Sequence, residues 1–255
     1  METVQKFAVP LAIIIAGAMI AISLYVVNAN GSSGTPQPGV VQKEIREVED
    51  GDHIRGNPNA KIVIVEFSDT ECPYCKMFHE TMKRIASDYG ASGDVAWVYR
   101  HWPIPGLHPK APKQAEALEC AAEQGGNEVF WKYTDMVYDR TQSNNSLDSG
   151  VYNTPKPVPV GPDGKPYYTE KTPRSTTDAG QLSDFAKELG LDVAKFEDCL
   201  KTSKYADRVT TDANEAVAAG AGGTPHSIIL VDGDQIPLEG AQPYETVKGL
   251  IDSLL

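Results

Sequence analysis

The sequence predicts an α/β fold with an inserted all-helical domain, preceded by an N-terminal transmembrane helix. Residues 8–27 carry no charged side chain and have about the length of a helix that crosses a membrane. The run Lys61–Phe67 (KIVIVEF) is short, β-branched and nearly all apolar, which is typical of a strand buried on both faces of a sheet. From Lys110 to about Gly220 apolar residues recur at helical spacing, and strand character returns only after this block.

The N-terminal region divides by composition into a short cytoplasmic N-terminus, a transmembrane anchor and a flexible linker rich in Gly, Ser and Pro: residues 1–7, 8–28 and 29–44. Lys6 precedes the apolar run and no Lys or Arg follows before Lys43. The rest of the protein is therefore expected outside the cytoplasm, in the periplasm or at the cell surface. The alternative is a signal peptide cleaved near Ala29, since small residues mark such cleavage sites.

Length and charge limit the possible classes of protein. With 255 residues, of which 41% are hydrophobic, the chain is long enough for one sizeable domain or two small ones. Its net charge of −12 argues against nucleic acid or anionic lipid as a partner. An acidic surface also keeps a domain soluble without any partner.

The globular part is expected to be discontinuous in the sequence. Residues 45–108 and 221–255 make the α/β domain, and residues 109–220 make the helical insert, which contains a Pro-rich loop over 141–180. Periodicity predicts strands at 61–67, 94–102, 226–231 and 235–238. It predicts helices from Pro73 onward and at 112–124, 128–140, 181–189, 193–201, 205–219 and 244–255.

A Cys-Pro-Tyr-Cys motif joins the first strand to the first helix. Pro73 suits a first helical turn, because its missing N–H would have no partner there. Cys72 would then lie at the helix N-terminus, where free N–H groups and the helix dipole stabilise a thiolate, the species that exchanges with disulfides. A redox-active Cys72–Cys75 disulfide is predicted; a structural disulfide or half of a zinc site are the alternatives. Cys120 and Cys199 lie far apart and form no second Cys-x-x-Cys, so no metal site is expected.

This motif after the first core strand, together with Gly223-Thr224-Pro225 before the later hairpin, resembles the thioredoxin superfamily. Within it, the long helical block resembles the DsbA-like thiol:disulfide oxidoreductases, here in a membrane-anchored form. The resemblance covers roughly residues 45–255 and implies a thioredoxin-like fold. The Cys-Pro-Tyr-Cys motif also resembles that of glutaredoxins, although those proteins are shorter, cytosolic and lack the insert.

The resemblance implies a role for each residue of the site. Cys72 would be the exposed nucleophile and Cys75 its buried partner. Glu66 would be a buried carboxyl that moves a proton to or from Cys75; a strand-end carboxylate that reaches solvent is the alternative. Thr224-Pro225 would be the cis-proline dipeptide. Substrate contacts are expected on both sides of the sulfurs, from Pro73, Tyr74, Thr224, Pro225 and His226.

Three histidines and two acids qualify this site. His226 follows the expected cis-proline, and its positive form would lower the pKa of Cys72. His101 at a strand end and His108 in a loop are interpreted as surface or structural residues. Asp69 and Glu71 lie close to Cys72 in the sequence, and their like charge opposes the thiolate.

The remaining two cysteines are expected to pair with each other. An even cysteine count in an oxidising compartment favours a structural Cys120–Cys199 disulfide between two helices of the insert. Two separate buried thiols are the alternative. Neither cysteine has a neighbouring cysteine that would resolve a catalytic intermediate.

The expected function is a thiol:disulfide oxidoreductase that introduces disulfides into extracytoplasmic proteins through a mixed disulfide on Cys72, without a cofactor. A reductase or isomerase, or a non-catalytic membrane-tethered binding protein or metallochaperone, are the alternatives. The resemblance implies reduced exported polypeptides as substrates and a quinone-linked membrane protein that reoxidises the dithiol. The protein would be a monomer held at the membrane by residues 8–28.

Overall fold

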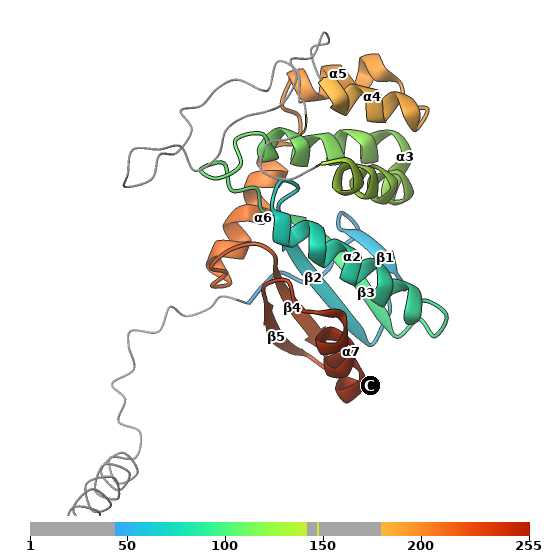
Figure 1. Ribbon diagram of the computed structural model, residues 1–255, viewed down its shortest axis with the longest axis vertical. Helices are drawn as coiled ribbons and strands as arrows, with labels where there is room; N and C mark the ends of the chain where they lie inside the picture. Colours follow the sequence, from blue (N-terminus) through green and yellow to red (C-terminus); the bar gives the residue numbers. More distant parts are fainter. Residues whose placement is uncertain (1–43, 142–146, 148–179) are drawn as a thin grey trace, which may run out of the picture. The chain divides into compact units, whose positions relative to one another are not determined.

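The computed structural model describes residues 44–141, 147 and 180–255. The predicted cytoplasmic N-terminus, the anchor, almost all of the linker and most of the Pro-rich loop lie outside these residues. Within the described ranges no helix is both long enough and apolar enough to cross a membrane. The same ranges contain one five-stranded mixed sheet with the strand order β1-β3-β2-β4-β5 (Figure 1).

All four predicted strands form, and a fifth joins them at the sheet edge. The strands are β1 (His53–Gly56), β2 (Ile62–Ser68), β3 (Val95–His101), β4 (His226–Val231) and β5 (Asp234–Glu239). β2 and β3 run parallel, and every other neighbouring pair is antiparallel. The added strand is β1, which pairs with β3 and which the sequence pattern did not predict.

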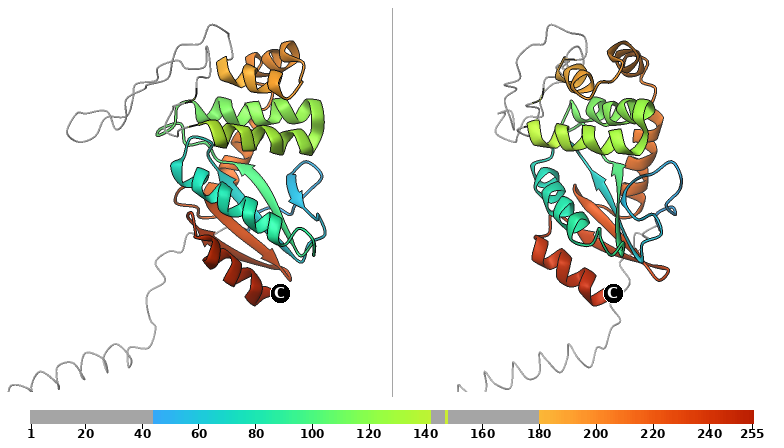
Figure 2. Two further views of the ribbon diagram at one scale, coloured as in Figure 1. Left: turned by 45° about the vertical axis from the view of Figure 1, so that its right-hand side comes forward. Right: turned by 90° about the vertical axis from the view of Figure 1, so that its right-hand side faces the viewer.

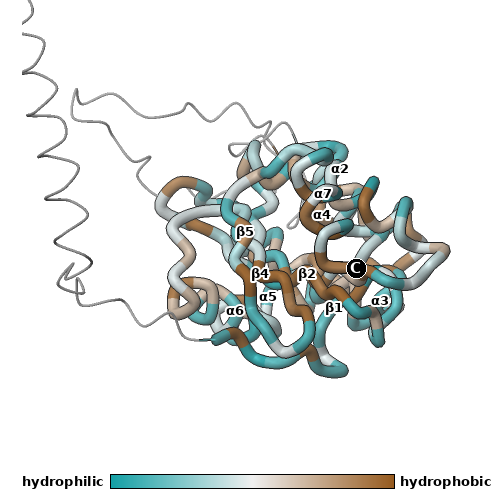
Figure 3. Tube along the Cα trace, turned by 90° about the horizontal axis from the view of Figure 1, so that it is seen from below, coloured by the Kyte–Doolittle hydropathy of each residue, from teal (hydrophilic) through white to brown (hydrophobic). Residues whose placement is uncertain are grey.

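Helices cover both faces of the sheet (Figure 2). They are α2 (Pro73–Asp88), α6 (Ala206–Ala218) and α7 (Tyr244–Leu254). Successive side chains of β2 point to opposite faces, so Ile62 and Ile64 pack in the core with α2 and α7, whereas Val65 and Phe67 pack in the core with α6. Apolar residues are concentrated along β2 and β4 (Figure 3), two of the three strands that have a neighbour on each side in this covered sheet.

The helical insert consists of α3 (Ala111–Arg140), α4 (Gly180–Glu188) and α5 (Val193–Lys201). α3 is interrupted at Gly126, whose φ of 65° and ψ of −158° are not helical. This interruption lies in the predicted gap between residues 124 and 128. α6 follows the insert in sequence but packs against β2 and β3. The change in packing therefore comes before α6 and not at residue 220, where the sequence pattern set the boundary.

A disulfide between Cys120 of α3 and Cys199 of α5 joins two helices of the insert. The predicted pairing is therefore present. Both sulfurs belong to the core cluster that also contains Phe196 and Leu200. The bond closes a loop across 79 positions of the sequence, so it restricts the unfolded chain strongly.

Removing this disulfide is expected to destabilise the protein. In a Cys120→Ala/Cys199→Ala variant the free energy of unfolding should fall by about 2–4 kcal/mol, because the unfolded chain regains the freedom that the closed loop denied it. Urea denaturation of both proteins without reductant measures this loss. Equal unfolding midpoints with equal slopes would contradict it.

Candidate active site

The two cysteines of the motif lie at the start of α2. Cys72 is the N-cap residue with an extended backbone (φ −73°, ψ 124°), and Pro73 begins the helix. Cys75 is fully buried, and its sulfur accepts a hydrogen bond from the Asp69 N–H at 3.4 Å. Both cysteines are free thiols, so the structure represents the reduced form of the site.

Cys72 borders a cavity of about 720 Å³ whose walls are largely apolar. The walls come from Pro73 and Tyr74, from the segment 102–108 after β3 and from the segment 222–224 before β4. Cys72 is only 5% exposed, whereas Tyr74 is 60% exposed. The expectation of an exposed Cys72 sulfur is therefore wrong, because these neighbouring segments cover it and leave it facing the cavity.

The surroundings of Cys72 favour its thiolate. The largest contribution is a hydrogen bond from the Cys75 thiol, and hydrogen bonds from Thr224 and from the backbone N–H groups of Cys75 and Tyr74 add to it. Together they outweigh burial and lower the pKa of Cys72 to about 6. Burial raises the pKa of Cys75 well above that of an ordinary thiol. At neutral pH Cys72 therefore carries the charge and Cys75 the proton.

Glu66 of β2 is fully buried beneath this pair, which excludes the solvent-facing alternative. Ser68 Oγ donates a hydrogen bond to its Oε1 at 2.6 Å, and Trp97 Nε1 donates to its Oε2 at 2.9 Å. Burial nevertheless raises the pKa of Glu66 to about 7. The charge of Glu66 is one of the causes that raise the pKa of Cys75, so the carboxyl and the buried sulfur influence each other's protonation.

A chain of hydrogen bonds leads from Glu66 into the helical insert. Ser68 Oγ also lies 2.8 Å from the Tyr138 hydroxyl, which lies 3.1 Å from the Tyr99 hydroxyl. All these groups are buried. Because Tyr138 belongs to α3, the insert holds the Ser68 hydroxyl in the place where it contacts Glu66.

The two acidic residues before Cys72 are buried and paired with hydrogen-bond donors. The Asp69 carboxylate accepts hydrogen bonds from the backbone N–H groups of Glu71 and Ile104 at 2.8 and 2.7 Å, and from His108 Nδ1 at 2.9 Å. Glu71 Oε1 accepts a hydrogen bond from the side-chain amide of Gln114. These donors compensate the carboxylate charges, which weakens the predicted opposition to the Cys72 thiolate.

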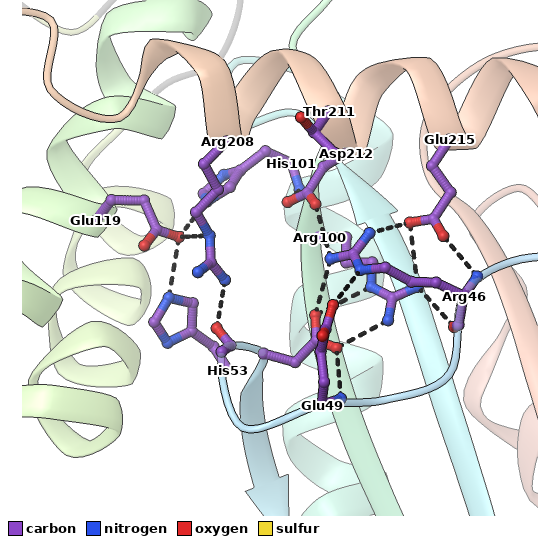
Figure 4. Close-up of polar contacts among 12 residues, drawn as sticks. Arg46, Glu49, His53, Arg100, His101, Glu119, Arg208, Thr211, Asp212 and Glu215 are labelled. Carbon is purple, nitrogen blue, oxygen red and sulfur yellow. Dashed lines mark hydrogen bonds and ion pairs between the residues drawn. The ribbon is translucent and has the colours of Figure 1, made fainter.

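The structure places His108 and His226 differently from the prediction and confirms a structural place for His101. His108 is buried and lines the Cys72 cavity, so it is not a surface residue. His226 lies in β4 between Phe67 and Glu239, is not among the cavity-lining residues, and has its pKa lowered by burial. The histidine beside the Cys72 sulfur is therefore His108 and not His226. His101 is structural: its Nε2 lies 2.8 Å from Glu119 in a buried polar cluster (Figure 4).

The five predicted substrate contacts divide into two groups. Pro73, Tyr74 and Thr224 line the cavity, whereas Pro225 and His226 are not among its lining residues. The Thr224–Pro225 peptide bond is cis, and the Thr224 carbonyl oxygen lies 3.5 Å from Cys72 Sγ. Among the described residues, no group of three or more His, Cys, Asp or Glu side chains is arranged to hold a metal ion.

The fold is that of a DsbA-like thiol:disulfide oxidoreductase. Three features define it: a sheet with a parallel β2–β3 pair, a dithiol at the start of α2 and a cis-proline before β4. The thioredoxin family model matches residues 48–253, and the chain belongs to this family.

Solved structures with this fold include two DsbA proteins and BdbD. Pseudomonas aeruginosa DsbA2 is 25% identical, with a TM-score of 0.59 over 82% of this chain and 97% of that protein. Wolbachia pipientis α-DsbA1 is 20% identical, with a TM-score of 0.61 over 81% and 92% of the two chains. Oxidised BdbD from Bacillus subtilis is 20% identical, with a TM-score of 0.58 over 80% and 92%.

The curated relatives that match the chain are much longer proteins. The Na(+)/H(+) antiporter NhaA 3 of Salinispora tropica is 28% identical over 187 residues, which are 73% of this chain but 23% of the antiporter. The Na(+)/H(+) antiporter NhaA of Herminiimonas arsenicoxydans is 30% identical over 202 residues, 79% of this chain and 25% of that protein. The chain thus spans about a quarter of the length of these relatives.

Proposed function

We propose that this protein is an extracytoplasmic enzyme that introduces disulfides into other polypeptides through the Cys72–Cys75 pair. The observation that carries the proposal is the place of Cys72 at the start of α2, where hydrogen bonds from the Cys75 thiol, from Thr224 and from the first backbone N–H groups lower its pKa to about 6. A stabilised thiolate is a good leaving group, and a dithiol that is stabilised when reduced makes its disulfide a strong oxidant. Thiol oxidation of a substrate is therefore the favoured direction.

Disulfide transfer proceeds in two exchanges. A substrate thiolate attacks Cys72 Sγ, the bond between Cys72 and Cys75 breaks, and Cys75 leaves as a thiolate that takes a proton from Glu66. A second substrate thiolate then attacks the substrate sulfur of the mixed disulfide. The substrate leaves as a disulfide, and Cys72 leaves as the stabilised thiolate. The two electrons that the substrate thiols lost have passed to the Cys72–Cys75 pair.

The cavity beside Cys72 determines which substrates reach the sulfur. Its apolar walls and the exposed ring of Tyr74 suit an unfolded segment with apolar side chains. Thr224 lines this cavity, and its backbone is placed to bind such a segment in extended form. Reduced exported polypeptides have both properties, and they are the proposed substrates.

One partner and the membrane anchor complete the proposed cycle. The reduced enzyme needs an oxidant, for which a quinone-linked membrane protein is proposed. The predicted anchor at residues 8–28 would keep the domain beside such a partner and outside the cytoplasm.

The reduction potential of the Cys72–Cys75 pair tests the direction. Equilibration of the protein with glutathione buffers, read by mass spectrometry after acid quench and alkylation, is expected to give a value well above that of thioredoxin, between about −200 and −120 mV. A value near that of thioredoxin, roughly −270 mV, would overturn the oxidase assignment in favour of a reductase. The Cys75→Ala variant is the matched control, because it retains Cys72 but cannot form the disulfide.

A further inference from the structure

His108 and Asp69 form a pair beside Cys72 that the mechanism above does not use. Asp69 follows β2 and His108 lies in the segment after β3. The parallel pairing of β2 with β3 brings the ends of these strands to one edge of the sheet, where α2 begins. The Asp69–His108 pair and Cys72 therefore lie at the same edge of the sheet, and His108 and Cys72 line one cavity.

Asp69 is held rigidly in this arrangement. Its Oδ1 accepts the Glu71 N–H, and its Oδ2 accepts the Ile104 N–H as well as the hydrogen bond from His108. The side chain is fully buried. Both carboxylate oxygens of Asp69 therefore act as hydrogen-bond acceptors. His108 must then donate from Nδ1, which leaves Nε2 as the proton acceptor of the neutral ring.

The Nε2 atom of His108 is free to react. It has no hydrogen-bond partner among the residues that the structure describes. It is also not one of the fully enclosed polar atoms without a partner, so part of its surface is open. Since the ring lines the Cys72 cavity, Nε2 is accessible from the space that a substrate sulfur must enter.

The charges around His108 support a proton-transfer role. Asp69, Glu71 and Cys72 face it from the junction of β2 and α2, and they raise its pKa against the effect of burial. Lys110 lies two positions further along the same segment, and its Nζ donates to the Leu147 carbonyl oxygen at 3.0 Å. The balance of negative charge favours a proton on His108 once the Cys72 thiolate has formed.

We propose that His108 is a catalytic base for the substrate thiol that resolves the mixed disulfide on Cys72, and that Asp69 is the positioning residue that orients it. The inference rests on the proposed function and adds the group that activates the second substrate thiol.

The second substrate thiol gives its proton to His108 Nε2 and becomes a thiolate. This thiolate attacks the substrate sulfur that is bound to Cys72, a sulfur–sulfur bond forms within the substrate, and the bond to Cys72 Sγ breaks. Cys72 takes the electron pair of that bond and leaves as a thiolate beside the imidazolium. Solvent later takes the proton from His108.

The test uses two attacking thiols that differ in their need for a base. A mixed disulfide between Cys72 and a cysteine peptide is formed on the full-length Cys75→Ala protein, with and without His108→Asn. Asparagine keeps a side-chain N–H for Asp69 but has no basic atom. At pH 7 an ordinary cysteine thiol is only about 3% ionised, so its attack in the His108→Asn protein is expected to be slower by about tenfold to a hundredfold. Thionitrobenzoate is already ionised and should attack both proteins at the same rate.

The decisive quantity is the rate of attack by the cysteine peptide divided by the rate of attack by thionitrobenzoate. A distorted cavity or a partly unfolded variant would slow both thiols alike and leave this ratio unchanged. Equal slowing of both thiols, or no slowing of the cysteine peptide, would overturn the inference and leave the proposed function standing. Failure of the Cys75→Ala protein to form any mixed disulfide would overturn the proposed function and the inference with it. Asp69→Asn, which keeps the shape but not the charge, is expected to lower the same ratio.

Discussion

Glu66→Gln is expected to slow the opening of the Cys72–Cys75 disulfide by a substrate thiolate by about a hundredfold, which is the lower end of what a general acid contributes. The attack leaves Cys75 as a thiolate in a fully buried position, and glutamine has no proton to neutralise it. With a pKa of about 7, Glu66 holds its proton in a large fraction of molecules at neutral pH. Stopped-flow fluorescence with a cysteine peptide between pH 5 and 9 measures this rate.

The pH profile separates proton transfer from a loss of structure. When the rate is divided by the concentration of peptide thiolate, it should fall above pH 7 in the wild type and stay level in Glu66→Gln. Glu80→Gln, which changes an exposed glutamate of α2, is the matched control and should retain the wild-type profile. A wild-type profile that stays level, or a variant profile that falls in the same way, would refute the role of Glu66.

The same substitution should change how stability depends on pH. The pKa of Glu66 is about 7 in the folded protein and 4.5 in its ordinary state, so its stabilising contribution is complete below pH 4.5 and is lost as the pH rises through 7. At about 1.4 kcal/mol for each pKa unit, this group alone lowers the free energy of unfolding by about 3 kcal/mol between pH 5 and 8. Urea denaturation of the reduced protein should show this decline in the wild type and not in Glu66→Gln.

Arg100→Leu is expected to cause the largest loss of stability, about 3–5 kcal/mol, because it removes the fully buried partner of Asp52. Within the described residues, that carboxylate then keeps only the partly exposed Arg46 as an ion-pair partner. Arg100 and Asp52 have fully buried side chains joined by two hydrogen bonds, from Nε at 3.0 Å and from a terminal nitrogen at 2.8 Å. Arg100 also binds Glu215 of α6 at 3.1 Å (Figure 4). The residue thus joins β3, α6 and the segment before β1.

Acid titration checks the cause of this loss. Burial alone would raise the pKa of Asp52, but the hydrogen bonds and charge of Arg100 outweigh burial and lower it. The stability that this pair contributes is therefore present above the ordinary value of 3.8 and is lost as the pH falls through the lowered pKa. Below that pH, the free energies of unfolding of the wild type and of Arg100→Leu should become more similar. Arg140→Leu, which breaks an exposed pair with Glu188, is the matched control and should change stability little.

Much of the fold could be predicted because the relevant signals are local. The buried strand Ile62–Ser68, the proline-started helix after it and the hairpin of β4 and β5 each depend on residues near one another in the sequence. β1 escaped prediction because it has only four residues, HIRG, with a single apolar aliphatic side chain. It forms a strand because it pairs with β3, whose partner residues lie 40 to 46 positions away.

The catalytic site divides in the same way. The two cysteines could be predicted from their motif after a strand, and the roles of Glu66 and Thr224-Pro225 from the family resemblance that this motif supports. The pair of Asp69 and His108 could not, since 39 positions separate them. One signal pointed to it: each residue follows a strand of a parallel pair, and the carboxyl ends of such strands meet at one edge of the sheet.

Local signals in the sequence were sufficient for the redox motif and for the order of the helices and of strands β2 to β5, whereas the burial of Glu66 stayed open between two alternatives. Contacts between distant segments were needed to establish that Cys72 is covered and faces a cavity, and that α6 packs against the sheet. The same contacts place His108, and not His226, in the wall of that cavity. The reason is physical. Backbone preferences and side-chain periodicity act between neighbours in the sequence, whereas burial, pKa values and ion pairing depend on which distant segments the sheet brings together.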